Sequence, residues 1–580
     1  MKKNTLTAFL LCAALVSARA TARDIIVSGH DPAAADTNPG TVAAPLKTIA
    51  AAAERMQAGD RVLIKGGTYH EYAGFDKLTG AGPESRSVIM AYPGEKPVLD
   101  GSVPLDLDFK PARIALRKTR NQLKQQFGFD GDNIREAVGI DGIAAVETPD
   151  FVLNTAGLDH SEAEFVGIYY ADYEGPGQLL FADGRRLQKI GYQANPKRRE
   201  YSGWRLKREW YGKDVSDLEP GSFYYDRDNK KLFVWLESGR HPDEAEWRDS
   251  VLSRLAHFDI DYCTVQGLEF RNCRDGAGHN QQMVAVSGSH TRLENCNFYN
   301  GEILGLVISG ENQTIQSCNF ANNGICGISS SWSVNLEIRD CTFRNTAWLG
   351  DFRCCHNGNK LCNAHQVKII GNTFFNQHAM AVWLDINCND ALVADNYFEG
   401  ASCAIYFEIS RWGVLVNNVM KNCSTGIWSY SSDTLISNNI FDGCGEGVRL
   451  TSMVRRCRYH PRGLTSEAPL MQVRNNLVVN NVFVDCPGSY ITCSPDSAYG
   501  NGNYSDHNVF AWLIPQIHFG GNHIKFMKPW DKYLGRLDFW HRQFNYDPHS
   551  VIADPTLLQA RRQNRAWQHV NGYNLVGAPK

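Results

Sequence analysis

Residues 293–298 read LENCNF, and similar hexapeptides return at 315–320 (IQSCNF), 338–343 (IRDCTF), 369–374 (IIGNTF) and 393–398 (VADNYF). Each hexapeptide has an apolar first residue, Cys or Asn at the fourth position and Phe at the sixth. Self-similarity at a short period indicates a repeat architecture, in which each repeat buries its apolar face against its neighbours. The middle of the chain is therefore predicted to be a stack of similar coils.

The spacing of the Cys and Asn positions indicates the kind of repeat. Most steps between them are 21 to 24 residues, and one step of 31 residues (372 − 341) contains an additional loop. Three short strands and three turns in each coil fit a right-handed parallel β-helix, which rises by one strand spacing per coil. The positions are Cys273, Cys296, Cys318, Cys341, Asn372, Asn396, Asn418 and Asn439, with Asn481 and Asn508 after insertions.

These Cys and Asn side chains are predicted to form an inward turn ladder. Asn tolerates left-handed bends and hydrogen-bonds its neighbours, and small thiols suit a buried column better than a metal site. The 31-residue step carries Cys354, Cys355 and Cys362, for which the spacing leaves open a disulfide to Cys388 or Cys326.

The first twenty residues are predicted to be a signal peptide. Lys2 and Lys3 precede an apolar run at 6–16 and an Ala-Arg-Ala sequence at 18–20, which is the pattern of a secretory signal. No later apolar run reaches the ~20 residues that a membrane span needs. We therefore expect an extracytoplasmic protein, periplasmic or secreted, without a membrane span.

The rest of the chain is predicted to be all-β and to contain three parts. Residues 21–104 hold an Ala-rich capping helix at 46–56 and the first coils. The repeat is lost over 105–250, where a hairpin at 223–235 indicates an inserted β-sandwich-like outer domain. Residues 251–580 form the main β-helix with a C-terminal extension.

The overall charge excludes one class of partner. Lys and Arg number 59 against 62 for Asp and Glu, a net charge of −3. The chain therefore lacks the global cationic field that draws in nucleic acid. A neutral or weakly charged partner fits this composition better.

Alignment of the coils places two acids on neighbouring strands. Residues 306, 328, 351, 382, 405, 427 and 448 form an almost wholly apolar column, which therefore points inward, and its neighbours in the strand point outward. The outward columns are predicted to be a solvent-facing aromatic ridge and a carboxylate pair. They comprise Trp383, Tyr406, Trp428 and Arg449, and next to them Asp385, Glu408, Tyr430 and Thr451.

The spacing of the two acids fits a glycosidase that retains anomeric configuration. Asp385 and Glu408 are 23 residues apart, which is one coil, so about 4.8 Å separates their positions. Retaining glycosidases hold two carboxyl groups ~5–5.5 Å apart, and one of two such close acids has a raised pKa and serves as the general acid. Two alternatives are a structural acid ladder relieved by Arg411 or Arg449 and a cation site.

The strands AVWLD (381–385) and AIYFE (404–408) resemble the catalytic strands of β-helix glycosidases, particularly glycoside hydrolase family 120 β-xylosidases, with family 141 a close second. The hairpin PGSFYYDRD (220–228) also looks like the outer β-sandwich of such enzymes. The resemblance implies that Asp385 is the nucleophile and Glu408 the acid/base, and it makes a homo-oligomer reasonable.

The predicted function is a secreted retaining glycoside hydrolase for plant-type oligo- or polysaccharides, β-xylosidase-like, without a metal or other cofactor. The aromatic residues Trp383, Tyr406 and Trp428 are expected to stack on a sugar ring. Four polar residues are expected to bond sugar hydroxyls: His356, His378, Arg411 and Arg449. Trp204 of the insert is expected to close over the cleft.

Two other functions remain open at the level of sequence. A polysaccharide lyase would use calcium held by Asp385, Asn387 and Asp390, with Arg411 or Arg449 as its base. A non-catalytic protein would use the aromatic ridge to bind glycans. The paired acids favour hydrolysis, since a binding surface has no use for two carboxylates that flank one bond.

Overall fold

The computed structural model describes residues 22–78, 81–112, 114, 167–191, 214–237, 240–274, 282–348, 358–451, 455–456, 470–471, 473–493, 501–511 and 547–553. The predicted signal peptide (1–20), His356 and Trp204 lie outside the described residues, as does most of the predicted C-terminal extension.

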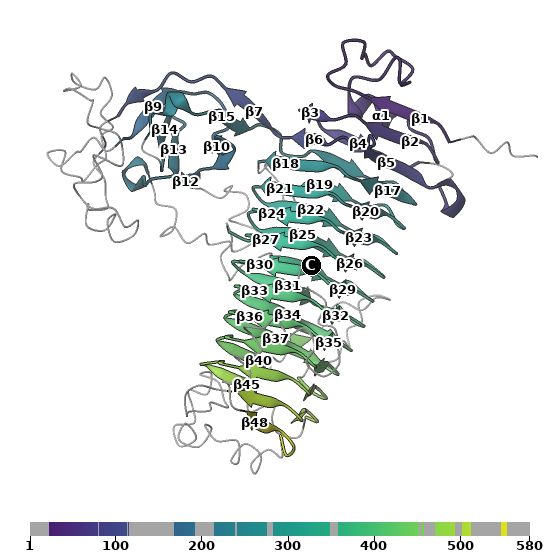
Figure 1. The fold of residues 1–580 in the computed structure, drawn as a ribbon, viewed down its shortest axis with the longest axis vertical. Helices are drawn as coiled ribbons and strands as arrows, with labels where there is room; N and C mark the ends of the chain where they lie inside the picture. Colours follow the sequence, from purple (N-terminus) through teal and green to yellow (C-terminus); the bar gives the residue numbers. More distant parts are fainter. Residues whose placement is uncertain are drawn as a thin grey trace, which may run out of the picture.

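Three parallel sheets run along the molecule and enclose one core (Figure 1). Successive coils visit the sheets in the same order, so each strand pairs with the equivalent strand one coil later. Leu293 pairs with Ile315 and Phe298 with Phe320. The parallel β-helix predicted from the repeat is confirmed.

The first 13-stranded sheet consists of β1 (Asp24–Val27), β2 (Arg61–Ile64), β5 (Ser87–Ala91), β17 (Cys263–Gln266), β20 (Arg292–Glu294), β23 (Thr314–Gln316), β26 (Glu337–Arg339), β29 (Lys368–Ile370), β32 (Leu392–Ala394), β35 (Val414–Val416), β38 (Leu435–Ser437), β43 (Leu477–Val479) and β46 (Tyr504–Asp506). The second consists of β3 (Gly67–Tyr69), β6 (Pro97–Asp100), β18 (Glu269–Cys273), β21 (Asn297–Gly301), β24 (Asn319–Ala321), β27 (Thr342–Arg344), β30 (Thr373–Phe375), β33 (Tyr397–Glu399), β36 (Val419–Lys421), β39 (Ile440–Asp442), β44 (Val482–Val484), β47 (Val509–Ala511) and β48 (Val551–Ala553).

The 11-stranded sheet, which carries the candidate site, consists of β4 (Ala73–Phe75), β16 (Ala256–Phe258), β19 (Gln282–Val286), β22 (Leu304–Ile308), β25 (Cys326–Ser331), β28 (Gly358–Cys362), β31 (Met380–Asp385), β34 (Cys403–Arg411), β37 (Thr425–Ser432), β40 (Glu446–Leu450) and β45 (Ser489–Cys493).

Columns of identical side chains fill the interior. The Phe rings of successive coils stack face to face, with centroids 4.7 Å apart between Phe298 and Phe320. At the adjoining turn, the Asn396 amide donates to Asn418 Oδ1 at 3.0 Å, and Asn418 donates to Asn439 at 3.0 Å. Such a ladder satisfies buried polar groups in every coil, and the predicted inward Asn ladder is confirmed.

Two predictions about cysteines are wrong. Cys273 pairs with Gly301, and because Glu269 pairs with Asn297 it is Leu268 that holds the first ladder position. This coil is longer than the sequence pattern suggests, since 28 residues separate Leu268 from Cys296. Cys388 and Cys326 carry free, buried thiols and so form neither of the disulfides left open by the spacing.

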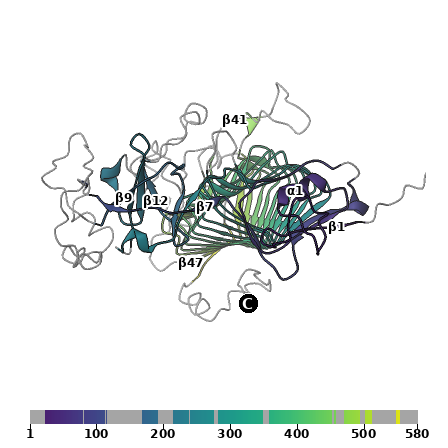
Figure 2. The same ribbon diagram turned by 90° about the horizontal axis from the view of Figure 1, so that it is seen from above.

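One short helix caps the N-terminal end of the stack. The helix α1 spans Ile49–Arg55, shorter than the predicted 46–56, and Thr48 caps it by accepting from the Ala51 amide. The Glu71 carboxylate accepts from the backbone amides of Ile49 and Ala50 at 3.0 Å each. Figure 2 shows α1 across the end of the coils, where it covers an otherwise open core.

The region between the early and the late coils forms a separate lobe beside the β-helix (Figure 1). Its two small sheets share an apolar core that includes Tyr173, Phe223 and Trp247. One sheet contains β11 (Arg185–Arg186), β10 (Leu180–Ala182), β15 (Trp247–Ser250) and β7 (Ser102–Leu105); the other contains β12 (Gln188–Ile190), β13 (Ser222–Asp226), β14 (Lys231–Trp235), β9 (Tyr169–Asp172) and β8 (Lys110–Pro111).

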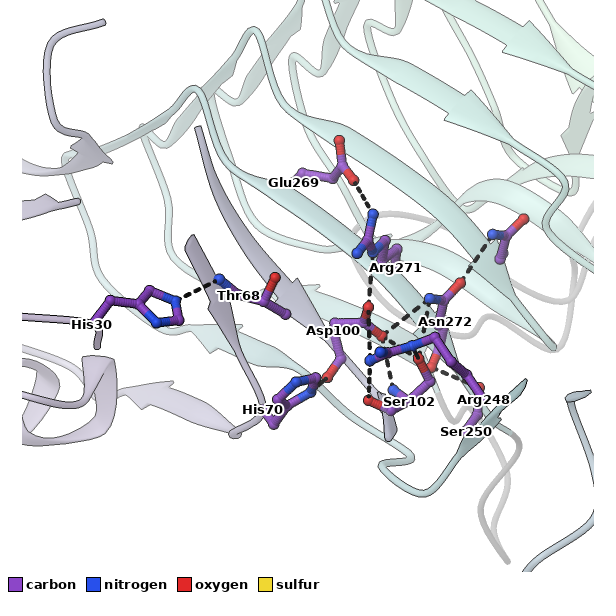
Figure 3. Close-up of polar contacts among 11 residues, drawn as sticks. His30, Thr68, His70, Asp100, Ser102, Arg248, Ser250, Glu269, Arg271 and Asn272 are labelled. Atoms are coloured by element: carbon purple, nitrogen blue, oxygen red, sulfur yellow. Dashed lines mark hydrogen bonds and ion pairs between the residues drawn. The ribbon is translucent and has the colours of Figure 1, made fainter. Parts of the chain in front are cut away.

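A buried carboxylate joins this lobe to the coils (Figure 3). Asp100 is fully buried, accepts from the Ser102 hydroxyl at 2.6 Å and pairs with Arg271 at 2.9 Å and Arg248 at 3.6 Å. Burial opposes the ionisation of Asp100, but the hydrogen bonds from Ser102 and the charge of Arg271 outweigh it and lower its pKa. Asp100 therefore stabilises the junction as an ion.

Candidate functional site

The two predicted acids lie side by side in the 11-stranded sheet. The register of β31 and β34 pairs Trp383 with Tyr406 and Asp385 with Glu408. The next strand continues both columns, with Trp428 beside Tyr406. Because paired residues of neighbouring strands are about 4.8 Å apart, one coil repeat brings the two carboxylates within reach of one glycosidic bond.

Two rings of the aromatic column, Trp383 and Tyr406, are buried and Trp428 is half-buried, which corrects the predicted solvent-facing ridge. Trp383 is 7% exposed, Tyr406 6%, Asp385 5% and Glu408 6%. The rings of Trp383 and Tyr406 lie 5.4 Å apart, and Trp428 follows at 4.8 Å from Tyr406. They pack with Met380 and other apolar side chains in a cluster outside the coil core, so large neighbouring side chains remove each other from water.

A lysine that the alignment of the coils did not place here completes the site. Lys360 on β28 stands opposite Trp383, and its Nζ lies 2.7 Å from Asp385 Oδ2 and 3.9 Å from the centre of the Trp383 ring. Residue 351 was predicted to lie in this strand, whereas the strand begins at Gly358 and is irregular before Lys360. The 31-residue step was the available signal, because its surplus residues can precede the strand.

The environments of the two acids differ. The Lys360 ammonium forms an ion pair with Asp385, and the two side chains are only 9% and 7% exposed. Asp385 Oδ1 has no hydrogen-bond partner within the described chain. Burial, together with the charge of Asp385, raises the pKa of the Glu408 carboxyl to about 7. Trp383 Nε1 donates to Glu408 Oε2 at 3.0 Å and partly offsets this rise. One acid is thus paired with a cation, and the other retains a proton near neutral pH.

The backbone is strained directly after each acid. Ile386 follows Asp385 with φ = 48°, and Ile409 follows Glu408 with φ = 50°. A β-branched residue in the left-handed region is costly, and such outliers gather at functional sites. The two isoleucines pack against each other. The bend ends β31 at Asp385 and interrupts the regular pairing of β34 after Glu408, so it fixes the position of both carboxylates.

Of the two predicted substrate-binding arginines, Arg449 lies against the aromatic column and Arg411 ends the strand that carries Glu408. The Arg449 guanidinium is 4.9 Å from the centre of the Trp428 ring and forms an ion pair with Glu446. Arg411 is the last residue of β34, and its backbone amide donates to Asn389 at 3.0 Å. Both remain predictions as substrate ligands.

His378 lies at the opposite end of the strand from the acids. It precedes Asp385 by seven residues, roughly 20 Å of extended chain. Burial and the nearby charge of Arg186, from the inserted lobe, lower the pKa of His378. The structure therefore groups His378 with the lobe and not with the carboxylates.

The residues proposed for calcium do not fit that ion. Asp385 is paired with the Lys360 ammonium, which repels a cation, and the Asn387 amide donates to Asn363 Oδ1 at 3.2 Å in the turn. Asp390 lies in the same bend, is exposed and has a left-handed backbone. A calcium site needs six to eight converging oxygens, and these three residues do not supply them.

Comparison with known proteins agrees with the class of fold. Residues 282–441 match the family described as "Right handed beta helix region". This match indicates that the coils are right-handed. The solved structure "The complex structure of XylC with xylose" superposes with a TM-score of 0.52 and 14% identity, covering 91% of this chain and 86% of that one. Another, "Glycoside hydrolase", has a TM-score of 0.48 and 12% identity, covering 86% and 94%.

One curated sequence is also similar. "Pectate lyase PEL9" of Emericella nidulans is 38% identical over 92 residues, which are 15% of this chain. The chain matches 22% of that relative's length. No helix in the described part of the chain is long and apolar enough to cross a membrane.

Proposed function

We propose that the protein is a retaining glycoside hydrolase acting on plant-type oligo- or polysaccharides, with a β-xylosidase-like reaction. The proposal depends mainly on the contrast between the two paired acids: Lys360 forms an ion pair with Asp385, and Glu408 keeps its proton up to a pH of about 7. Double displacement needs one nucleophilic carboxylate and one protonated acid on the same bond.

The geometry gives each group a role. Asp385 Oδ1, which has no hydrogen bond to the described residues, attacks the anomeric carbon as Glu408 transfers its proton to the leaving oxygen. Glu408 then removes a proton from water, which displaces Asp385 and releases the sugar with its configuration retained. Trp383 positions Glu408 through its indole N–H throughout. Trp428, the half-buried ring of the column, supplies the aromatic surface for the sugar, and the buried Tyr406 packs against it.

The test is a screen of aryl glycosides and plant-wall oligosaccharides, with the product anomer followed by proton NMR. We expect hydrolysis with retention, lost in Asp385→Asn and in Glu408→Ala. Asp390→Asn is the matched control, since Asp390 is an exposed acid one turn away and Asn tolerates its left-handed backbone. Near-normal turnover by Asp385→Asn would overturn the assignment, as would glycan binding without cleavage.

A polysaccharide lyase is the second candidate. The amino group of Lys360 beside the acids and the partial similarity to a pectate lyase favour it. A lyase would abstract a proton from a uronate and leave an unsaturated product that absorbs in the ultraviolet. Such a product, in place of a reducing sugar with retained configuration, would replace the hydrolase proposal.

The export of the protein and its association are also proposals. Residues 1–20 have the signal pattern described above, and N-terminal sequencing of secreted material should begin near residue 21. The family resemblance favours a homo-oligomer, which light scattering on the purified protein would measure.

A further inference from the structure

The C-terminal coils carry a cluster of two histidines and one carboxylate, far along the stack from the paired acids. Asp506 ends β46, His507 follows it, and His549 lies in the turn before β48. Their ligand atoms all lie within 4.8 Å of one another. Among the described residues, no other group of three such side chains lies this close together.

The cluster is centred on one carboxylate oxygen. Asp506 Oδ2 lies 2.6 Å from His549 Nδ1 and 3.6 Å from His507 Nε2, and the two imidazole rings are stacked with an interplanar angle of 11°. The Asp506 side chain is 1% exposed, whereas those of His507 and His549 are 58% and 66% exposed. The group is therefore anchored on its inner side and open to solvent on its outer side.

Contacts that do not involve the rings fix the carboxylate. Asp506 Oδ1 accepts from the backbone amides of His507 and His549 at 2.8 and 2.7 Å, and the Tyr504 hydroxyl donates to Oδ2 at 2.8 Å. Supporting bonds of this kind orient first-shell ligands around metals. They also keep the two histidine side chains close to one oxygen.

We propose that Asp506, His507 and His549 form a binding site for a divalent transition metal of the zinc class. Two imidazole nitrogens and one carboxylate oxygen suit zinc, whereas calcium and magnesium favour oxygen alone. Tetrahedral ligand atoms about 2.0–2.2 Å from an ion are roughly 3.4 Å apart. The 3.6 Å contact already fits, and the 2.6 Å contact opens by less than about 1 Å when the metal displaces the shared proton to solvent.

The metal would stabilise the end of the stack. It would join the turn at His507 to the turn at His549, 42 residues later in the chain. The latter turn precedes β48, which pairs with β47 as the last described strand of its sheet. An ion bound only by the folded state stabilises that state by mass action, and here it would hold an edge strand in place.

The test uses the full chain without a histidine tag. Calorimetric titration with ZnCl2 should show one equivalent bound per chain, Co2+ should give the visible absorption of a low-coordinate site, and zinc should raise Tm until a chelator is added. His507→Asn removes one ligand, leaves the Asp506–His549 contact, and keeps a backbone (φ = 55°) that Asn adopts readily.

The matched control is His290→Asn, since His290 is also a turn residue with a left-handed backbone (φ = 56°). We expect the zinc step and the Co2+ spectrum to disappear in His507→Asn and to persist in His290→Asn. If the wild-type chain binds no zinc, or His507→Asn binds zinc as the wild type does, the Asp506–His549 pair is a structural contact that holds no metal, and the proposal is wrong.

Discussion

Replacement of Lys360 by Met removes the one described cation that pairs with Asp385. Unit charges 2.7 Å apart attract by roughly 6 kcal/mol at an effective dielectric constant of about 20, and breaking a buried pair costs about 3–5 kcal/mol after relaxation. Since about 1.4 kcal/mol corresponds to one pH unit, the acidic limb of kcat/KM should move up by roughly two to four units.

The assay is the pH dependence of kcat/KM between pH 4 and 9 on the best glycoside found in the screen. Lys421→Met is the matched control, because Lys421 pairs with Glu399 at 3.3 Å on the second 13-stranded sheet and is 42% exposed; it should leave the profile unchanged. An acidic limb in Lys360→Met that coincides with that of the wild type would refute the reasoning. Loss of an unsaturated product at every pH, with Tm unchanged, would instead identify Lys360 as the base of a lyase.

Three further predictions concern the same site and the scaffold. Activity should fall above a pH of about 7 as Glu408 loses its proton, and Trp383→Phe should move this basic limb up by roughly one unit because a hydrogen bond to the anion is lost; an unmoved limb would contradict the role of the indole. Because its pKa is lowered in the folded state, Asp100 should stabilise the protein above about pH 4, and this contribution should fade as the pH drops through the folded-state value. Urea unfolding of Asp100→Asn should therefore show a loss of about 3 kcal/mol at pH 7 that shrinks at pH 3; a constant difference would contradict this. Asn418→Ala should lose roughly 3–5 kcal/mol in the same assay because it leaves buried ladder groups unpaired, while the exposed Asn319→Ala should lose less than about 1 kcal/mol; equal losses would argue against the ladder as the source of stability.

The sequence alone was sufficient to predict the coil and the pairing of the two acids. Both depend on local period: a repeat of 21 to 24 residues fixes which residues stack, and two-residue alternation fixes which face they take. Asp385 therefore stands opposite Glu408, and the Asn ladder runs inside, as predicted.

Tertiary structure decided what the period does not encode. Loops of unequal length shifted the first ladder position from Cys273 to Leu268, and an irregular strand start brought Lys360 to Asp385. Burial of the aromatic column likewise depends on neighbours from several coils. Each of these features depends on contacts between residues distant in sequence. The raised pKa of Glu408 and the contact between Asp506 and His549 therefore follow from the fold and from no local pattern.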